Sequence, residues 1–265
     1  MVCRSPCAAW DVRRSFEDKG PNTMAEPNDT AVDNAPLDGP DFGEDLFDNT
    51  LEFADNPEPR CPCVLVLDTS QSMAGEPMTA LHRGLHVFRD QLLAMPLASK
   101  RVEVAIVSFG ADVEVVQDFI TVDRFQPPAL QAAGETPMCT AILKALDILE
   151  IRKGRYRANG VPYSRPWVFL ITDGMPQGET METTRQAVQR IRAAEAAHKV
   201  AFFAIGIEGA NRKLLARIAV RPPLELESLR LGDVFAWLSA STARAATNSA
   251  DDQLALPSEM GERPA

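Results

Sequence analysis

Residues 64–72 of this 265-residue chain read VLVLDTSQS, and they give the clearest indication of its fold. The first four residues of this stretch form a continuous apolar run, which is typical of a strand buried on both faces of a parallel sheet. Similar runs recur at VEVAIVSF (102–109), WVFLITD (167–173) and VAFFAIGI (200–207). Strands of this kind need helices on both faces of their sheet.

Helical periodicity separates these apolar runs. We expect helices over 78–95, 138–151, 181–198 and 212–220, and a last one near 233–242. The alternation predicts an α/β fold, a Rossmann-like, doubly wound and mostly parallel sheet with helices on both faces. VEVVQDFI (113–120) follows its preceding strand after a short Gly-Ala-Asp turn, so we expect it to be an antiparallel edge strand.

The net charge of −10 is confined to the N-terminal part of the chain. Residues 25–59 hold eleven Asp or Glu residues and no Lys or Arg, whereas residues 60–265 hold 23 of each sign. This predicts an acidic, disordered leader (1–59), a folded domain (60–243) and a flexible tail (244–265). A neutral domain behind an acidic arm argues against nucleic acid or an anionic membrane as the partner.

The N-terminal residues bear on where in the cell the protein lies and on whether it binds a partner. No run approaches 18 apolar residues, and MVCRSPCAAW (1–10) lacks the apolar core of a secretory signal, so we expect a cytoplasmic protein. Met24 heads the acidic segment, and a start there would explain the change in composition. The leader is either a solubilising tail or a short helix that docks on a partner through Phe42, Leu46, Phe47, Leu51 and Phe53.

Oxygen-bearing side chains gather at the expected carboxyl ends of two strands. Asp68, Ser70 and Ser72 follow the first apolar run, Asp173 ends the third run, and Thr136 directly precedes a helix. Because open parallel sheets bind ligands outside the carboxyl ends of their strands, we expect these five residues to converge. Hydroxyl and carboxylate oxygens suit Mg²⁺, or Mn²⁺ and Ca²⁺, rather than zinc or copper.

This pattern resembles a known family. Asp68-x-Ser70-x-Ser72, followed by Thr136 and Asp173, resembles the metal-ion-dependent adhesion site of von Willebrand factor A (vWA) domains. The segments LDTSQSMAGEPMTAL and RPWVFLITDGMP are similar to the bacterial TerY/YegL-type subgroup. The resemblance implies that the three hydroxyls contact the metal and that the two Asp residues bind it directly or through water. An open coordination position would then accept an Asp or Glu carboxylate from a partner protein.

The resemblance covers roughly residues 61–242 and implies a binding module rather than an enzyme. We expect an adaptor in a bacterial stress or tellurium-resistance-type phosphoregulatory system, with a protein kinase or a PP2C-type phosphatase as partner. The alternative is an adaptor for a MoxR-type AAA+ ATPase. An enzymatic alternative, a Mg²⁺-dependent hydrolase of the haloacid-dehalogenase type, requires Asp-x-Asp, and here Ser70 replaces the second acid.

Other polar residues have simpler interpretations. His82 and His86 are ordinary helix histidines, because Arg83 stands where an H-E-x-x-H zinc motif has Glu. Cys61 and Cys63 are interpreted as small buried residues. A basic stretch is either a solvated connecting loop or a landing surface for an acidic partner or for the leader: Arg152, Lys153, Arg155, Arg157 and Arg165. We also hypothesise that a leader carboxylate occupies the metal site in the resting protein.

Overall fold

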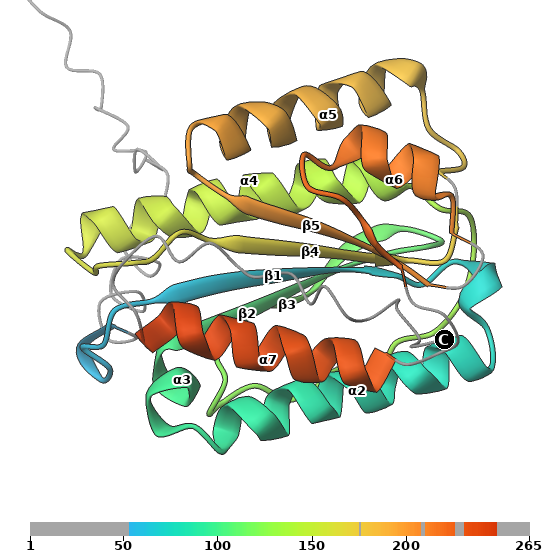
Figure 1. Ribbon diagram of the computed structural model, residues 1–265. Helices are drawn as coiled ribbons and strands as arrows, with labels where there is room; N and C mark the ends of the chain where they lie inside the picture. Colours follow the sequence, from blue (N-terminus) through green and yellow to red (C-terminus); the bar gives the residue numbers. More distant parts are fainter. Residues whose placement is uncertain (1–52, 175, 208–209, 226–230, 248–265) are drawn as a thin grey trace, which may run out of the picture. The chain divides into compact units, whose positions relative to one another are not determined.

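The computed structural model describes residues 53–174, 176–207, 210–225 and 231–247. Within this part, six strands form one sheet in the order β3-β2-β1-β4-β5-β6 (Figure 1). Neighbouring strands pair in parallel, except that β2 and β3 are antiparallel. The predicted doubly wound fold with an antiparallel edge strand is therefore confirmed. The strands are β1 (Cys61–Asp68), β2 (Val102–Phe109), β3 (Val113–Thr121), β4 (Trp167–Thr172), β5 (Ala201–Gly206) and β6 (Leu224–Glu225).

Helices cover both faces of the sheet (Figure 1). One face carries α2 (Glu76–Leu93), α3 (Pro96–Arg101) and α7 (Leu231–Thr247). The other face carries α4 (Met138–Ala158), α5 (Met181–Ala196) and α6 (Arg212–Ile218). A short 3-10 turn, η1 (Gln71–Met73), joins β1 to α2. The sequence did not predict α3 or β6, because elements of six and two residues carry too little periodic signal.

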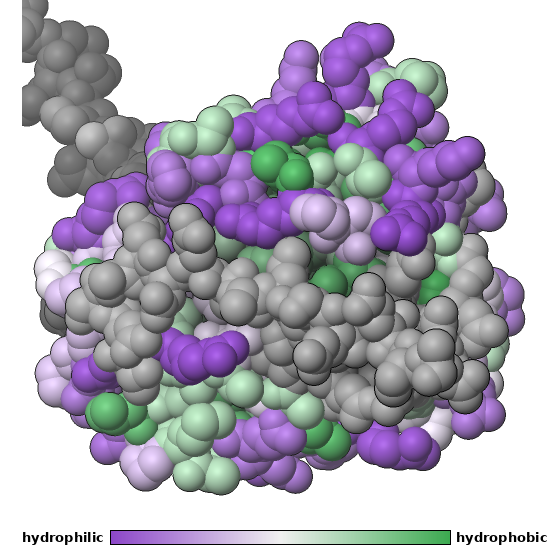
Figure 2. Space-filling model, in the orientation of Figure 1, coloured by the Kyte–Doolittle hydropathy of each residue, from purple (hydrophilic) through white to green (hydrophobic). Residues whose placement is uncertain are grey.

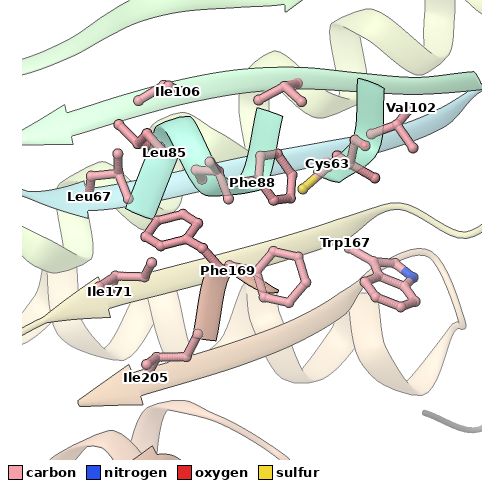
Figure 3. Packing of buried hydrophobic residues seen from close by; sticks show 14 of the residues in the cluster. Cys63, Leu67, Leu85, Phe88, Val102, Ile106, Trp167, Phe169, Ile171 and Ile205 are labelled. Carbon is pink, nitrogen blue, oxygen red and sulfur yellow. The ribbon is translucent and has the colours of Figure 1, made fainter. Parts of the chain in front are cut away.

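Strand side chains alternate between the two helical layers. In β1, Leu65 and Leu67 belong to the apolar cluster under α2 and α7, whereas Val64 and Val66 belong to the cluster under α4 and α5. Figure 3 shows Phe88 of α2 among side chains of the strands in the first cluster. The outward surface of α5 is largely hydrophilic (Figure 2), as expected of a helix that covers one face of a core.

A buried carboxylate on β2 binds the segment that precedes β1 through hydrogen bonds and ion pairs. Glu103 of β2 is fully buried and accepts hydrogen bonds from Arg60 Nε and Arg152 Nε, both at 2.8 Å, and from the Tyr156 hydroxyl. Phe53 is only 7% exposed, and the Arg152 guanidinium lies 5.0 Å from its ring centroid. The alternative in which Phe53 docks on a partner is therefore wrong, because its own domain buries it. The other apolar leader residues lie outside the described part of the chain: Phe42, Leu46, Phe47 and Leu51.

Most of the basic stretch after residue 151 is helical; only Arg165 lies in the segment that connects α4 to β4. Helix α4 continues through it to Ala158, and Arg152 and Lys153 are buried, 2% and 3% exposed. Lys153 pairs with Glu150, and Arg165 pairs with a buried carboxylate at the end of α5. The interpretation of the stretch as one solvated loop is therefore wrong, because Arg152, Lys153 and Arg165 are paired within the domain. Arg155 is half-buried and Arg157 is exposed on α4, and nothing in the structure tests whether these two meet a partner.

Candidate metal centre

The candidate residues lie where two neighbouring strands send their connections to opposite faces of the sheet. Strand β1 leads into α2 on one face, whereas its parallel neighbour β4 leads into α5 on the other. Asp68 is the last residue of β1, and Asp173 directly follows β4. Such a switch point is where open α/β sheets bind ligands, because the diverging chains leave the strand ends accessible.

Hydrogen bonds join four of the five predicted residues. Ser72 Oγ donates to Asp173 Oδ1 over 2.9 Å, and Ser70 Oγ lies 2.9 Å from Ser72 Oγ. Because Asp173 receives the only hydroxyl proton of Ser72, Ser70 is the donor in the second contact. The Ser70 backbone N–H also donates to Asp68 Oδ1 over 2.9 Å. The structure therefore brings together side chains from two loops that are far apart in the sequence.

Thr136, the fifth predicted residue, lies beside Asp68. A Cβ at Gly174 would lie 3.7 Å from Thr136 Oγ1 and 3.9 Å from Asp68 Oδ2. Both oxygens therefore border the same small space, which the lack of a side chain at Gly174 leaves open. Thr136 does not cap α4, because the N-cap position belongs to Pro137. Its hydroxyl is thus available for a ligand rather than used by the helix.

Burial shapes the acid–base properties of Asp68. The side chain is fully buried, and this burial raises the pKa of its carboxyl above the ordinary value. The nearby Asp173 carboxylate also raises that pKa, whereas hydrogen bonds from Ser70 and from Thr172 Oγ1 lower it. A divalent cation would favour the ionised form, because its charge balances two carboxylates in a poorly solvated place.

Backbone hydrogen bonds fix the loops that carry these residues. The Gln71 N–H donates to the Gly134 carbonyl over 3.1 Å, which ties the loop after β1 to the segment before Thr136. The Gln177 N–H donates to the Thr136 carbonyl over 3.1 Å, which ties in the loop after Asp173. The relative positions of the five side chains are therefore set by contacts between loops.

Two residues that the sequence did not single out support this arrangement. Thr172 Oγ1 donates a hydrogen bond to Asp68 Oδ2 over 2.5 Å. The sequence could have indicated this role, because Thr172 places a hydroxyl at the end of an otherwise apolar strand. Glu179 accepts hydrogen bonds from the backbone N–H groups of Cys139 (2.8 Å) and Thr140 (2.6 Å) at the start of α4. Nothing local signals this role, because its partners lie about forty positions earlier in the chain.

His82, Cys61 and Cys63 are part of the domain's internal packing, and His86 lies on the helix surface. His82 Nε2 accepts a hydrogen bond from the Leu130 N–H over 2.8 Å, and His86 is exposed on the same helix. Cys61 and Cys63 are buried and free of disulfides. Burial raises the pKa of the Cys61 thiol to about 11, so it is neutral at physiological pH.

The donor set fits a hard divalent cation. It offers two carboxylates and three hydroxyls, all of them oxygen ligands of the kind that Mg²⁺ and Ca²⁺ prefer. In the described part of the chain, no group of three or more His, Cys, Asp and Glu side chains could hold a metal ion. A cation at this edge would therefore depend on the hydroxyls of Ser70, Ser72 and Thr136 as well as on the two carboxylates.

The family model of the von Willebrand factor type A domain matches residues 63–234. This chain belongs to the von Willebrand factor type A domain family. The match begins within β1 and ends within α7, so it contains the five candidate residues. VWA domains are a family of protein-interaction and adhesion modules. No curated protein sequence matches the chain.

Solved structures show the same fold at low sequence identity. The vWF domain of the type V pili tip protein Mfa5 from Porphyromonas gingivalis is 10% identical, with a TM-score of 0.53, over 74% of this chain and 99% of that one. The pilus adhesin SpaC from Lactobacillus rhamnosus GG is 15% identical, with a TM-score of 0.54, over 72% of this chain and 31% of that one. The PilB minor pilin from Streptococcus sanguinis is 14% identical, with a TM-score of 0.50, over 73% and 64%. This chain therefore spans less than two thirds of SpaC and of PilB.

No helix within the described residues is long and apolar enough to cross a lipid bilayer.

Proposed function

We propose that this VWA domain is a Mg²⁺-dependent protein-interaction module. One observation carries the proposal: the hydrogen-bonded series of Asp68, Ser70, Ser72 and Asp173, with Thr136 on its flank, at a topological switch point. These residues would hold Mg²⁺, with Mn²⁺ or Ca²⁺ as alternatives. The cation would leave one coordination position for an Asp or Glu carboxylate of a partner protein.

The residue types support binding rather than turnover. Two carboxylates balance the charge of a divalent cation, and neutral hydroxyls leave it able to attract a third carboxylate. The position where a haloacid-dehalogenase-type hydrolase needs a second acid holds Ser70, and its hydroxyl donates to Ser72. A hydroxyl is a poor general acid at neutral pH. We therefore propose that the domain is not an enzyme.

The sequence resemblance to the TerY/YegL-type subgroup supports a cellular setting. We propose a cytoplasmic adaptor in a stress or tellurium-resistance-type phosphoregulatory system, whose partner is a protein kinase or a PP2C-type phosphatase. A MoxR-type AAA+ ATPase is the alternative partner. The charge balance of residues 60–265 supports a protein partner rather than nucleic acid or an anionic membrane.

Titration calorimetry with Mg²⁺ and Mn²⁺ tests the metal site directly. The exposed Ser72 makes Ser72→Ala the first variant, because its loss leaves the buried core intact. We expect metal binding by the unmodified chain and at least tenfold weaker binding by Ser72→Ala and by Asp68→Ala. Asp90→Ala, which removes an exposed carboxylate near the other end of α2, is the matched control and should bind normally. Equal binding by all variants would remove the basis of the proposal.

Affinity capture tests the binding role. The full chain is used as bait in lysate with Mg²⁺ and again with EDTA, and Ser72→Ala is the matched bait. A partner recovered only with Mg²⁺, and lost with the variant, would support metal-bridged binding and would identify the pathway. Partners that are indifferent to both treatments would contradict it.

A further inference from the structure

Four loops meet around the candidate metal centre and pack on one another. Gln71 donates its N–H to the Gly134 carbonyl, and a Cβ at Gly134 would lie only 2.4 Å from Ala111 Cα. Gln177 donates its N–H to the Thr136 carbonyl. We call this contiguous loop surface the metal-edge rim; it consists of residues 69–76, 110–112, 133–137, 173–174 and 176–179.

The metal-edge rim has a negative charge of its own. Its sequence contains no Lys and no Arg, and it exposes the carboxylates of Glu76, Asp112 and Glu135. A divalent cation would balance Asp68 and Asp173, so the three exposed charges remain after the metal is bound. A partner that brings a carboxylate to the metal must therefore approach through a negative field.

In the described part of the chain, every Lys and Arg lies outside the rim segments. Arg185 pairs with Glu182, and Arg212 and Lys213 begin α6, which follows β5. Three helices start at or next to the rim, and a helix rises about 1.5 Å per residue. The first Lys or Arg of each helix therefore lies about 6–11 Å along the helix axis from its first residue. At this distance physiological salt, with a screening length of about 8 Å, weakens the influence of these cations on the rim without removing it. These residues are Arg83 in α2, Lys144 in α4 and Arg185 in α5.

We propose that the metal-edge rim selects a basic partner segment, in which one Asp or Glu is flanked by Lys or Arg. The carboxylate would meet the cation, and the flanking side chains would meet Glu76, Asp112 and Glu135. This inference rests on the proposed metal site, and it specifies in addition that the partner segment is positively charged. A neutral or acidic segment would offer the same carboxylate without the compensating contacts, so it would bind more weakly.

The chain's own acidic leader is a poor occupant under this proposal. Residues 25–59 contain eleven carboxylates and no Lys or Arg, so a leader carboxylate would bring further negative charge to the rim. Its last residues are also held elsewhere: Arg60 donates to the backbone carbonyls of Asn56 and Glu58, before the start of β1. The hypothesis that the leader occupies the metal site in the resting protein is thus disfavoured by charge.

Nuclear magnetic resonance titration of the full chain with short peptides tests the selection. Three nine-residue probes each carry a carboxylate: one with the core Lys-Lys-Asp-Lys-Lys, one with Ser-Ser-Asp-Ser-Ser, and leader residues 41–49 (DFGEDLFDN). A fourth probe replaces the Asp of the basic peptide with Asn. Each is measured with Mg²⁺ and with EDTA at 50 and 200 mM salt, after calorimetry has established whether Mg²⁺ itself binds.

We expect the basic probe to bind about tenfold more tightly than the neutral probe at 50 mM salt, from three exposed charge pairs. The preference should shrink at 200 mM salt and require both Mg²⁺ and the Asp. The triple variant Glu76→Gln, Asp112→Asn, Glu135→Gln should reduce the preference to about twofold or less. The matched variant Asp55→Asn, Asp90→Asn, Asp123→Asn removes three exposed charges elsewhere and should keep it.

Several results would overturn the charge selection. Equal binding of the basic and neutral probes, or tight binding of the leader probe, would contradict it while leaving the metal function intact. So would failure of the basic probe to bind at millimolar concentration to Mg²⁺-loaded protein. Binding of the basic probe that survives EDTA or the Asn replacement would show attraction by charge alone. Absence of Mg²⁺ binding in the calorimeter would instead refute the proposed function itself.

Discussion

Replacing Glu103 with Gln should destabilise the domain severely. The carboxylate is fully buried and receives hydrogen bonds from Arg60 and Arg152, which are 1% and 2% exposed, and from Tyr156. Gln keeps the shape but removes the negative charge with which the buried guanidinium groups of Arg60 and Arg152 pair. Breaking a buried ion pair in this way costs about 3–5 kcal/mol. That is a large part of the roughly 5–15 kcal/mol that stabilises a typical domain.

Urea unfolding followed by far-ultraviolet circular dichroism measures this loss. With a slope of about 2 kcal/mol/M, a loss of 4 kcal/mol lowers the midpoint by about 2 M. Glu182→Gln is the control, because it removes a carboxylate from an ion pair with Arg185 whose side chains are 73% and 63% exposed. That variant should change stability by less than about 1 kcal/mol. A Glu103→Gln variant that unfolds within 1 kcal/mol of the unmodified chain would refute the reasoning.

Four further predictions concern the helices, the cysteines and the metal edge. Glu179→Gln should cost about 1 kcal/mol in urea unfolding and weaken Mg²⁺ binding in calorimetry several-fold, because a charged acceptor at the start of α4 is lost. Gly84→Ala should cost about 1–3 kcal/mol in the same unfolding assay, since its Cβ would lie 2.2 Å from Phe235 Cδ2. Cys139, fully buried and with its pKa raised to about 12, should react with N-ethylmaleimide at pH 8 only after unfolding, as read by mass spectrometry. In EDTA at pH 7, Asp68→Asn should melt at a higher temperature than the unmodified chain. The raised pKa of Asp68 means that its ionised form destabilises the metal-free fold, so this difference should narrow as the pH falls toward 4.

The sequence predicted the sheet well because its signal is local. Apolar runs marked β1, β2, β4 and β5 to within a few residues, and the short turn before β3 identified the antiparallel edge. The helix expected at 138–151 was too short by one and a half to two turns, since α4 reaches Ala158. Its last turns bury Arg152, Lys153 and Tyr156, and charged residues on a buried face break the apolar pattern that marks a helix.

The five candidate residues could be named from the sequence because each stands at a strand end or just before a helix. Their convergence then followed from the general geometry of parallel sheets. The supporting contacts could not be predicted in the same way. Glu179 meets α4 through a loop closure of about forty residues, and Phe53 finds its place only through the rings and guanidinium groups around it. Such partners are chosen by tertiary packing, which leaves no periodic trace in the chain.

The contrast between Glu103 and Asp68 explains why one buried carboxylate is structural and the other is suited to a ligand. Both are fully buried, and they lie near opposite ends of the adjacent strands β2 and β1. Glu103 receives its hydrogen bonds from two guanidinium groups as well as a tyrosine, so its charge is balanced within the domain. The hydrogen bonds to Asp68 come from neutral donors, the Ser70 N–H and the Thr172 hydroxyl. Neutral donors solvate a carboxylate without cancelling its charge. A cation that binds from solution can cancel that charge. The two sites should therefore respond independently: Glu103→Gln should lower stability and leave the Mg²⁺ affinity of the folded protein unchanged, whereas Asp68→Asn should abolish Mg²⁺ binding and stabilise the metal-free fold. A loss of Mg²⁺ affinity in folded Glu103→Gln would contradict this separation.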